Sequence, residues 1–483
     1  MLKKNWLLGL ILIAVFVLYS PIFSVYLVGD DFFHIKISLT DGTLGGFINL
    51  FGFHPFSERL IAFYRPITRE LVYFTFYRLF GLSQFPFRIL SLAIHLVNIS
   101  LVYLLTKKIF KEKKISLFVM FFYGIAAANL APLSFSAGGL QTTGAAMFVL
   151  MTLILFEKHK ILSFITFLFG LASHELSIAG LPLLIGWQFL QMKRIRVKDY
   201  LIFIPHVLVT LIYLYLNIKV IGFSQGEVQY QPVFNPKAVI NSLAWYSIWA
   251  WGMPEMLVDY VRSGLSLNPN LMKFWGQYFK VIFPAFFLSA GVLLGSLVFL
   301  LIKARDIFLK REFWFFIFWF GVGLAPVIFL PLHRSSYYLA VSLPAFWIVM
   351  GMLSWEIMRK SKVFFGLLIL SLLVLNIFSI KVGEKTYWAF QRGQIAGKLV
   401  EQIKLKYPIL PTGAVVLWTN DPNYPQLSGD WKGSSNQAYF ILNGSDALTL
   451  LYQDPTLNVF YEDRGGVPEE IETPVYQITA KIN

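Results

Sequence analysis

Two adjacent carboxylates, Asp30 and Asp31, stand directly after the first long apolar run of the sequence. A solvated helix end is the ordinary reason for such a pair, but ionised groups beside hydrocarbon are costly and often functional. The polar stretch that begins with them continues with His54, Tyr64 and Arg65. A carboxylate near cations can take a proton from a hydroxyl group while the cations neutralise a departing anion. This segment is therefore the first candidate for a reactive site.

Two further polar insertions, His174-Glu175 and His333-Arg334, interrupt otherwise apolar sequence. Both fall on the same side of the membrane as Asp30 when the spans are counted as below, so we expect them to join one site. His174 and Glu175 could also bind a divalent metal together with Asp30. A dedicated metal site normally has more ligands, so no cofactor is firmly expected.

The residue types at these positions predict separate roles. Asp30 or Asp31 is the expected general base for a hydroxyl acceptor. Arg65 and Arg334 are the expected partners of a phosphate, because a guanidinium group pairs with phosphate oxygens and stays charged. The remaining candidates are expected to bind substrate: His54, Tyr64, His174, Glu175 and His333.

The composition places most of this chain in lipid. Of its 483 residues, 57% are hydrophobic and only 14% are charged, and the mean hydropathy is +0.64. The absence of cysteine excludes disulfides, thiolate metal sites and cysteine nucleophiles. The net charge is +15, but the basic residues form short clusters between apolar runs, which argues against nucleic acid as a partner.

The apolar runs predict about eleven membrane-spanning helices with the N-terminus in the cytoplasm. The runs lie at roughly residues 6–28, 86–106, 115–130, 140–156, 161–172, 176–191, 200–218, 278–302, 313–331, 336–355 and 363–380. The first is too long for a cleaved signal peptide. Basic clusters follow every even-numbered run, at residues 107–114, 158–160, 193–198, 303–311 and 359–362. The positive-inside rule assigns these clusters to the cytoplasm.

Three long segments then face the other, extracytoplasmic side: a first loop at residues 29–85, a second at 219–277 and the tail at 381–483. The tail contains strand-like runs at 414–418 and 457–461 between turn signals, so it predicts a small α/β domain. A stabilising or acceptor-guiding domain without chemistry is the favoured interpretation of this tail.

Other conspicuous residues have structural interpretations. His95 and Asn98, one turn apart in the second span, are expected to make hydrogen bonds between helices. Trp245, Trp249 and Trp251 are expected to join the aromatic belt at the membrane surface. Neither group is included in the predicted site.

The order of these motifs resembles the GT-C superfamily of polytopic membrane glycosyltransferases. Within that superfamily the pattern is most similar to the protein O-mannosyltransferases and their tetratricopeptide-bearing relatives, and it covers roughly residues 1–380. The resemblance rests on Asp30-Asp31, His54, Arg65-Pro66, residues 94–105, Ser173-His174-Glu175 and the element from His333 to Leu339.

The resemblance implies a GT-C-like transmembrane domain, all α-helical, over residues 1–380. It also implies inverting transfer of a sugar from a polyprenyl-phosphate donor to a hydroxyl acceptor on a protein, an envelope glycan or a lipid. A first-loop aspartate would be the base, and the family pattern favours Asp30. Three departures leave the acceptor and metal use open. An Asn129-to-Phe135 segment replaces a His-Pro-x-x-x-Glu type element, His174 replaces a lysine, and no tetratricopeptide repeats follow the last span.

Two other functions fit the same residues. A transporter or flippase of lipid-linked saccharides would also hold a phosphate with cations. Such a protein is expected to show paired halves with broken helices, and the sequence has no convincing internal repeat. A sugar polymerase or ligase of the cell envelope would differ mainly in its acceptor.

Overall fold

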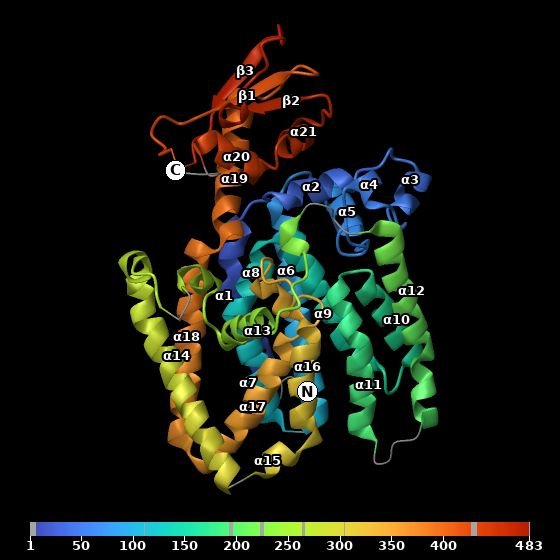
Figure 1. Cartoon of the computed structure of the whole chain (residues 1–483), viewed down its shortest axis with the longest axis vertical. Helices are drawn as coiled ribbons and strands as arrows, with labels where there is room; N and C mark the ends of the chain where they lie inside the picture. Colours follow the sequence, from blue (N-terminus) through green and yellow to red (C-terminus); the bar gives the residue numbers. More distant parts are fainter. Residues whose placement is uncertain are drawn as a thin grey trace.

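Long apolar helices form most of the molecule and run roughly along its long axis (Figure 1). The computed structural model describes residues 6–110, 112–192, 197–222, 227–262, 266–303, 305–426 and 432–482. Among these residues, six helical segments are long and apolar enough to cross a membrane. They are α1 with η2 (Trp6–Tyr19, Ser20–Ser24), α6 (Gln84–Phe110), α9 (Ser136–Leu155), η5 with α12 and η6 (Val197–Phe203, Ile204–Tyr215, Leu216–Ile221), α14 (Asn270–Lys303) and α18 (Lys362–Thr386).

A seventh candidate is broken in the middle. α7 (Lys113–Ile125) is followed by η3 (Ala127–Asn129) and α8 (Leu130–Ser134), and the two parts differ in direction by 46°. The break lies at Ala126, whose ψ of 127° is not helical, and Pro132 follows in the short α8.

The other predicted spans coincide with shorter or more polar helices. α10 (Lys160–Leu171), α11 (Gly180–Gln191) and α16 (Arg311–Leu324) have 12, 12 and 14 residues. α17 (Leu343–Lys360) carries charged side chains near its end. Helices of this length need tilt or close neighbours to cross a bilayer. The mainly helical membrane architecture is thus confirmed, while the count of about eleven spans and the GT-C-like fold stay predictions.

The helices pack through close apolar contacts. α6 packs against α7 and α9, α9 against α10, α14 against α18, and α17 against both α7 and α16. Gly351 of α17 faces α7, where an added Cβ would lie 2.5 Å from Cγ2 of Val119. Small residues at such crossings let two backbones approach closely. Within α6, His95 bonds to the Gly124 carbonyl at 3.0 Å and Asn98 donates to the Thr143 carbonyl at 3.0 Å, which agrees with their expected role between helices.

The described residues of the basic clusters lie at one end of the helices, whereas residues 193–196 of the third cluster lie outside the described part of the chain. Lys108 Nζ lies 2.7 Å from a carboxylate oxygen of Glu157, and Arg311 donates to the Met192 carbonyl at 3.1 Å. The short helix α15 (Asp306–Leu309), between two of these clusters, lies at the end opposite to the C-terminal strands (Figure 1). The charge pattern used to order the spans therefore agrees with the arrangement of the helices.

The first predicted loop forms a helical layer across the other end of the helices, beside the C-terminal domain (Figure 1). It contains α2 (Asp30–Ile37), α3 (Leu44–Asn49), α4 (Phe56–Arg59) and α5 (Glu70–Phe80). α2 packs against α5, and the start of this layer is set by Gly29, whose positive φ of 54° turns the chain into α2.

The second predicted loop is also partly helical, with η7 (Val228–Tyr230), α13 (Pro236–Trp251) and η8 (Glu255–Tyr260). The assignment of its tryptophans to an aromatic belt is wrong for Trp249, which is fully buried, and for Trp245, which is 9% exposed. α13 packs against η3 and against η10 (Ser336–Ala340), so its aromatic face is enclosed by protein and does not meet lipid headgroups.

The C-terminal segment contains a small three-stranded parallel sheet in the order β2-β1-β3. Strands β1 (Val415–Thr419) and β2 (Asn458–Tyr461) confirm the two predicted strand-like runs, and β3 (Val475–Thr479) was not predicted. Parallel strands need a crossover, which α20 (Ser434–Leu442) and α21 (Asp446–Tyr452) supply between β1 and β2. α19 (Trp388–Lys406) leads from α18 into this domain.

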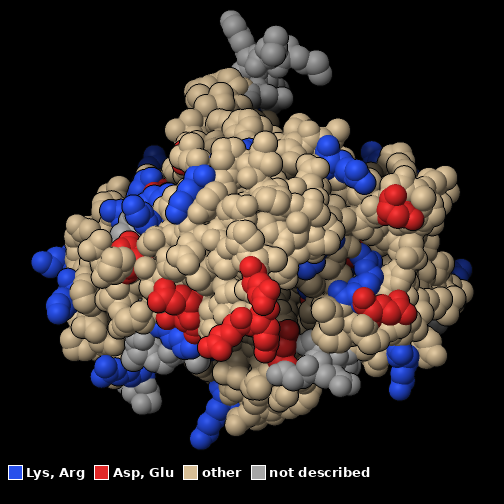
Figure 2. Space-filling model, turned by 90° about the horizontal axis from the view of Figure 1, so that it is seen from above, with Lys and Arg blue, Asp and Glu red and all other residues tan. Residues whose placement is uncertain are grey.

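The C-terminal domain rests on the helical layer that begins at Asp30. The Gly29 N–H donates to the Ile441 carbonyl at 2.9 Å, and Lys36 Nζ lies 2.6 Å from a carboxylate oxygen of Asp446. The Tyr77 hydroxyl donates to the Leu450 carbonyl at 2.8 Å. Viewed from this end, acidic side chains collect near the lower middle of the surface and basic ones lie mostly near its rim (Figure 2). The face thus presents mixed charge rather than one continuous basic surface.

Candidate active site

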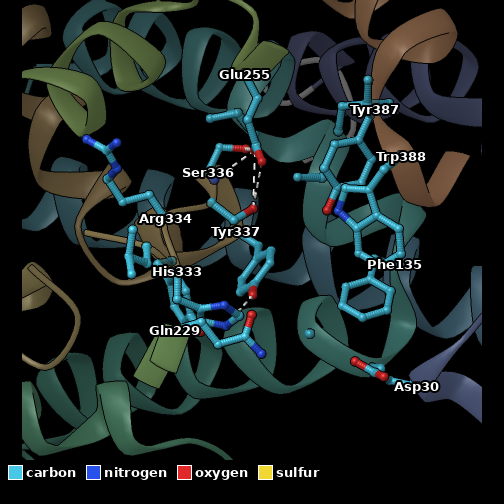
Figure 3. A pocket seen from close by; sticks show the side chains of 18 of the residues that line it. Asp30, Phe135, Gln229, Glu255, His333, Arg334, Ser336, Tyr337, Tyr387 and Trp388 are labelled. Carbon is cyan, nitrogen blue, oxygen red and sulfur yellow. Dashed lines mark hydrogen bonds between the residues drawn. The ribbon is translucent and has the colours of Figure 1, made fainter. Parts of the chain in front are cut away.

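A cavity of about 550 Å³ lies where the helical layer, the second loop and the α18–α19 junction meet. Its walls come from α2, η8, the segment that leads into η10, and the first residues of α19. Figure 3 shows Asp30 on one side of this space and Arg334 on the other. Five of the predicted site residues line it: Asp30, Arg65, His174, His333 and Arg334. Glu175 does not line it but is paired with Arg65.

Asp30 and Asp31 point into different surroundings, although they are adjacent. Asp30 is exposed to the cavity, and Asp31 is fully buried. Asp31 accepts hydrogen bonds from the Tyr73 hydroxyl at 2.7 Å and from the Val28 N–H at 3.2 Å. Successive residues of a helix are about 100° apart, so a helix that begins at Asp30 separates the two side chains. Of the two, only Asp30 can meet a ligand in the cavity.

The surroundings of Asp30 make its carboxylate more basic than usual. Enclosure by protein, reinforced by the negative charges of Asp31 and Glu227, raises the pKa of Asp30 to about 6. Protein walls replace much of the bulk water around this carboxylate even though the cavity keeps it accessible. A carboxylate with this pKa is mostly ionised at neutral pH and still accepts a proton readily.

Arg65 is held in an ion pair. Its Nη2 and Nε lie 2.6 and 3.0 Å from the two carboxylate oxygens of Glu175, and its Nη1 donates to Gln141. Burial alone would raise the pKa of Glu175, but the charge of Arg65 lowers it to about 2. Because Arg65 donates to Glu175 and Gln141, it holds the cavity wall in place and is not a free cation. This pairing revises its predicted role as a partner of the phosphate.

Arg334 differs from Arg65 in having no partner. Its Nη1 is buried without a hydrogen bond, and within the described residues it makes no ion pair. Its surroundings lower the pKa of this guanidinium through loss of water, but an arginine stays charged at any pH relevant here. Arg334 as a whole is half-buried, but a buried N–H group without a partner is costly, and a bound anion would offset that cost.

The two predicted histidines of the cavity are neutral. Burial and the charge of Arg65 lower the pKa of His174 to about 3, and its Nδ1 accepts the Leu176 N–H at 3.1 Å. The same two causes lower the pKa of His333 to about 4, and its ring lies 4.5 Å from that of Tyr230. Neither side chain therefore supplies a positive charge to a phosphate at neutral pH.

Two predicted residues lie outside this cavity. His54 bonds to the Asn49 carbonyl at 2.7 Å and to Glu58 at 3.4 Å, which ties it into its own loop. Tyr64 stacks on Phe53 at 3.8 Å between ring centres and donates to the Phe51 carbonyl. Neither side chain lines the cavity, although both lie close to Arg65 in the sequence, so their assignment to substrate binding stays a prediction.

Several residues of the cavity were not anticipated. The second loop contributes Glu227, Glu255 and Asp259. Glu255 accepts hydrogen bonds from both Ser335 and Ser336, which fixes the turn after Arg334. The sequence did not single out these three acidic residues, because they are spread over a long loop. The path of that loop depends on contacts with distant parts of the chain.

The α18–α19 junction and the first loop supply further unanticipated residues. Tyr387 and Trp388 line the cavity from the start of the tail, and the role of the tail as a stabilising or acceptor-guiding domain stays a prediction. Arg69 also lines the cavity and is paired with Glu70 at 2.8 Å. A Tyr-Trp pair shortly after the last apolar run, beyond the polar stretch 381–386, was the available signal for the junction.

No group of three or more histidine or acidic side chains is arranged to hold a metal ion in the part of the chain that the structure describes. The cavity nevertheless combines a basic carboxylate, an unpaired guanidinium and an aromatic wall at the end of a bundle of membrane helices.

Taken together, these features define a polytopic helical membrane protein with a polar cavity beneath a small α/β domain. Comparisons with protein-family models, with curated proteins and with solved structures found no match. Any assignment of function therefore depends on the cavity itself.

Proposed function

We propose that the protein is an inverting glycosyltransferase that moves a sugar from a polyprenyl-phosphate donor to a hydroxyl acceptor. The observation that carries this proposal is the pairing, across one cavity, of the accessible carboxylate of Asp30 with the unpaired guanidinium of Arg334. A base and an anion-binding cation on opposite sides of one space are what a displacement at a sugar carbon needs.

The reaction is a single displacement. The acceptor oxygen forms a bond to the anomeric carbon of the donor sugar, while the bond from that carbon to the phosphate oxygen breaks and its electron pair leaves with the phosphate. Asp30 takes the proton of the acceptor hydroxyl. The products are a glycoside of inverted configuration and polyprenyl phosphate, which carries one more negative charge than the phosphate of the donor.

Arg334 is assigned to that developing charge. Its planar guanidinium can pair with two phosphate oxygens, and it has no competing partner among the described residues. Arg65, which the sequence suggested for this role, is bound to Glu175 and instead keeps the wall beside Arg334 in place. The favourable interaction grows as the phosphate leaves, so it acts mainly on the transition state.

The cavity side of the membrane is proposed to be extracytoplasmic. Support comes from the basic clusters, which gather at the opposite end of the helices as the positive-inside rule expects of a cytoplasmic surface. Donor and acceptor would then meet at the outer surface of a cell membrane, with the lipid of the donor remaining in the bilayer.

The test is a transfer assay with purified protein in detergent. Polyprenyl-phosphate mannose and, separately, polyprenyl-phosphate glucose are supplied with a panel of hydroxyl acceptors, and both free polyprenyl phosphate and the new glycoside are quantified. Equal amounts of both products, with inverted anomeric configuration, are expected. Absence of release with mannosyl and glucosyl donors, together with movement of intact lipid-linked sugar across reconstituted vesicles, would contradict the proposal and indicate a flippase.

A further inference from the structure

The two ends of the cavity have different parts in the proposed reaction. In a single displacement the incoming oxygen and the leaving oxygen lie on opposite sides of the anomeric carbon. Asp30 and Arg334 lie on opposite sides of the cavity, and Phe135 and Trp388 line the side nearer Asp30 (Figure 3). The acceptor therefore occupies the space between Asp30 and Trp388, and the donor phosphate lies toward Arg334.

The acceptor side has an exposed aromatic surface. Trp388 is 39% exposed although it lines a cavity. Its ring is held in place by Phe135 and Tyr387, whose ring centres lie 4.8 and 6.0 Å away. An aromatic face carries partial negative charge and attracts the C–H groups on the apolar face of a pyranose ring.

The same wall carries two hydroxyl groups, those of Tyr387 and Ser379. The Ser379 hydroxyl is buried and makes no hydrogen bond within the described residues. The Tyr387 hydroxyl faces Ser335, whose own hydroxyl donates to Glu255. A buried hydroxyl without a partner is costly, so Ser379 favours a ligand that hydrogen-bonds to it. A prenyl chain would leave it unpaired, and a saccharide would not.

The charges around the cavity favour a neutral acceptor. Glu227, Glu255 and Asp259 line it, and none of them makes an ion pair in the parts of the chain that the structure describes. Together with Asp30, these carboxylates would repel an acidic sugar. Among the described residues that line the cavity, Arg334 is the cation without a partner, and it lies on the donor side.

We infer that the acceptor is a neutral saccharide, which lies against Trp388 and hydrogen-bonds to the Tyr387 and Ser379 hydroxyls. This inference rests on the proposed function, since it assigns the second substrate of the same reaction. It also gives the start of the C-terminal segment a direct part in substrate binding.

The test measures binding separately from transfer. The Asp30→Asn protein in detergent is titrated with methyl α-mannoside, with glucuronic acid and with a threonine-containing peptide, and saturation-transfer NMR reports which of them binds. We expect the neutral glycoside to bind best. Trp388→Ala is expected to weaken its binding at least about tenfold and Trp388→Phe by less, because a smaller ring keeps part of the stacking. Tyr387→Phe is expected to weaken it about fivefold through the lost hydrogen bond.

The matched control is Trp314→Ala, which removes a tryptophan that is 58% exposed on α16 and does not line the cavity. It is expected to leave glycoside binding unchanged. Glycoside binding that Trp388→Phe, Trp388→Ala and Tyr387→Phe all leave intact would overturn the inference, as would binding of the peptide alone or of no ligand.

The outcomes separate this inference from the proposed function. Binding of the glycoside at Trp388, without transfer by the unmodified protein from mannosyl or glucosyl donors, would support the saccharide site and contradict the transferase. Transfer to the peptide, without glycoside binding, would support the transferase and overturn the saccharide acceptor.

Discussion

The Tyr73 hydroxyl donates a 2.7 Å hydrogen bond to Asp31, and this bond holds that carboxylate in the protein interior while its neighbour Asp30 faces the cavity. Two side chains that look equivalent in the sequence thus have different parts. Asp31 stabilises the turn into α2, and Asp30 is left free for chemistry.

Asp31→Asn is expected to reduce stability more than it reduces the intrinsic chemistry. The amide can accept fewer of the hydrogen bonds from Tyr73 and Val28, and the buried Arg88 nearby loses a favourable charge. We expect a loss of about 1–3 kcal/mol in the free energy of unfolding, measured by thermal or denaturant unfolding in detergent. Unchanged stability would contradict the assignment of Asp31 as a structural carboxylate.

The pH dependence of transfer should follow Asp30. Its pKa is raised to about 6, so the base is protonated and inactive below that pH and ionised above it. The rate is expected to fall about tenfold per pH unit below pH 6. Glu227→Gln removes a negative charge that helps raise this pKa, so the acidic limb of the profile should move to lower pH. If the acidic limb of the pH–rate profile stays in place in Glu227→Gln, or moves to higher pH, the assignment of Asp30 as the titrating group would be contradicted.

Arg334→Gln should lower transfer while leaving the fold intact. The guanidinium has no partner to lose among the described residues, so its removal leaves no other charge unpaired. We expect a drop of about 10²–10³-fold in kcat, with partial activity in Arg334→Lys because an ammonium keeps the charge but not the planar fork. Equal activity in Arg334→Gln and in the unmodified protein would remove this residue from the mechanism.

Arg65→Gln should behave in the opposite way. It leaves the buried Glu175 without its cation, and the expected loss of stability is about 3 kcal/mol. The double variant Arg65→Gln, Glu175→Gln should recover much of that stability, as unfolding measurements on the three variants would show. Recovery of stability without recovery of transfer would argue that Arg65 acts on the substrate directly.

The orientation of the chain can be tested with single cysteines, because the sequence has none. Ile409 is 86% exposed near the C-terminal sheet, and Leu309 is 75% exposed on α15 at the opposite end. A membrane-impermeant maleimide should label Ile409→Cys in intact cells and Leu309→Cys only after permeabilisation, since a charged reagent does not cross hydrocarbon. The reverse pattern would place the cavity in the cytoplasm.

Hydropathy patterns predicted the helical segments and two of the strands, whereas the sidedness derived from charge and the count of about eleven spans stay predictions. The segments chosen as spans coincide with helices, and the strand-like runs of the tail are strands, because both patterns are local consequences of the solvent that each residue meets. The prediction that Trp249 belongs to the aromatic belt was wrong, since this side chain is fully buried. A helix buried by protein and a helix at a lipid interface can have the same apolar composition, so the sequence does not distinguish them.

The site could be predicted only in part. Asp30 and Arg334 were found because charges are conspicuous beside apolar runs. The ion pair between Arg65 and Glu175 joins residues 110 positions apart. The position of Trp388 in the cavity wall depends on the direction of α19 relative to α18. Such long-range contacts leave no local pattern, so the free cation and the aromatic wall became evident only with the fold.

The measurement that tests the central claim most directly is polyprenyl-phosphate release by the Asp30→Asn protein beside the unmodified protein and a matched Asp41→Asn control. Asp41 is an exposed carboxylate of the same loop whose hydrogen bonds are local to Thr43 and which does not line the cavity. We expect release to fall about 10²–10⁴-fold in Asp30→Asn and to be unchanged in Asp41→Asn. Release at the unmodified rate in a folded Asp30→Asn protein would contradict the account.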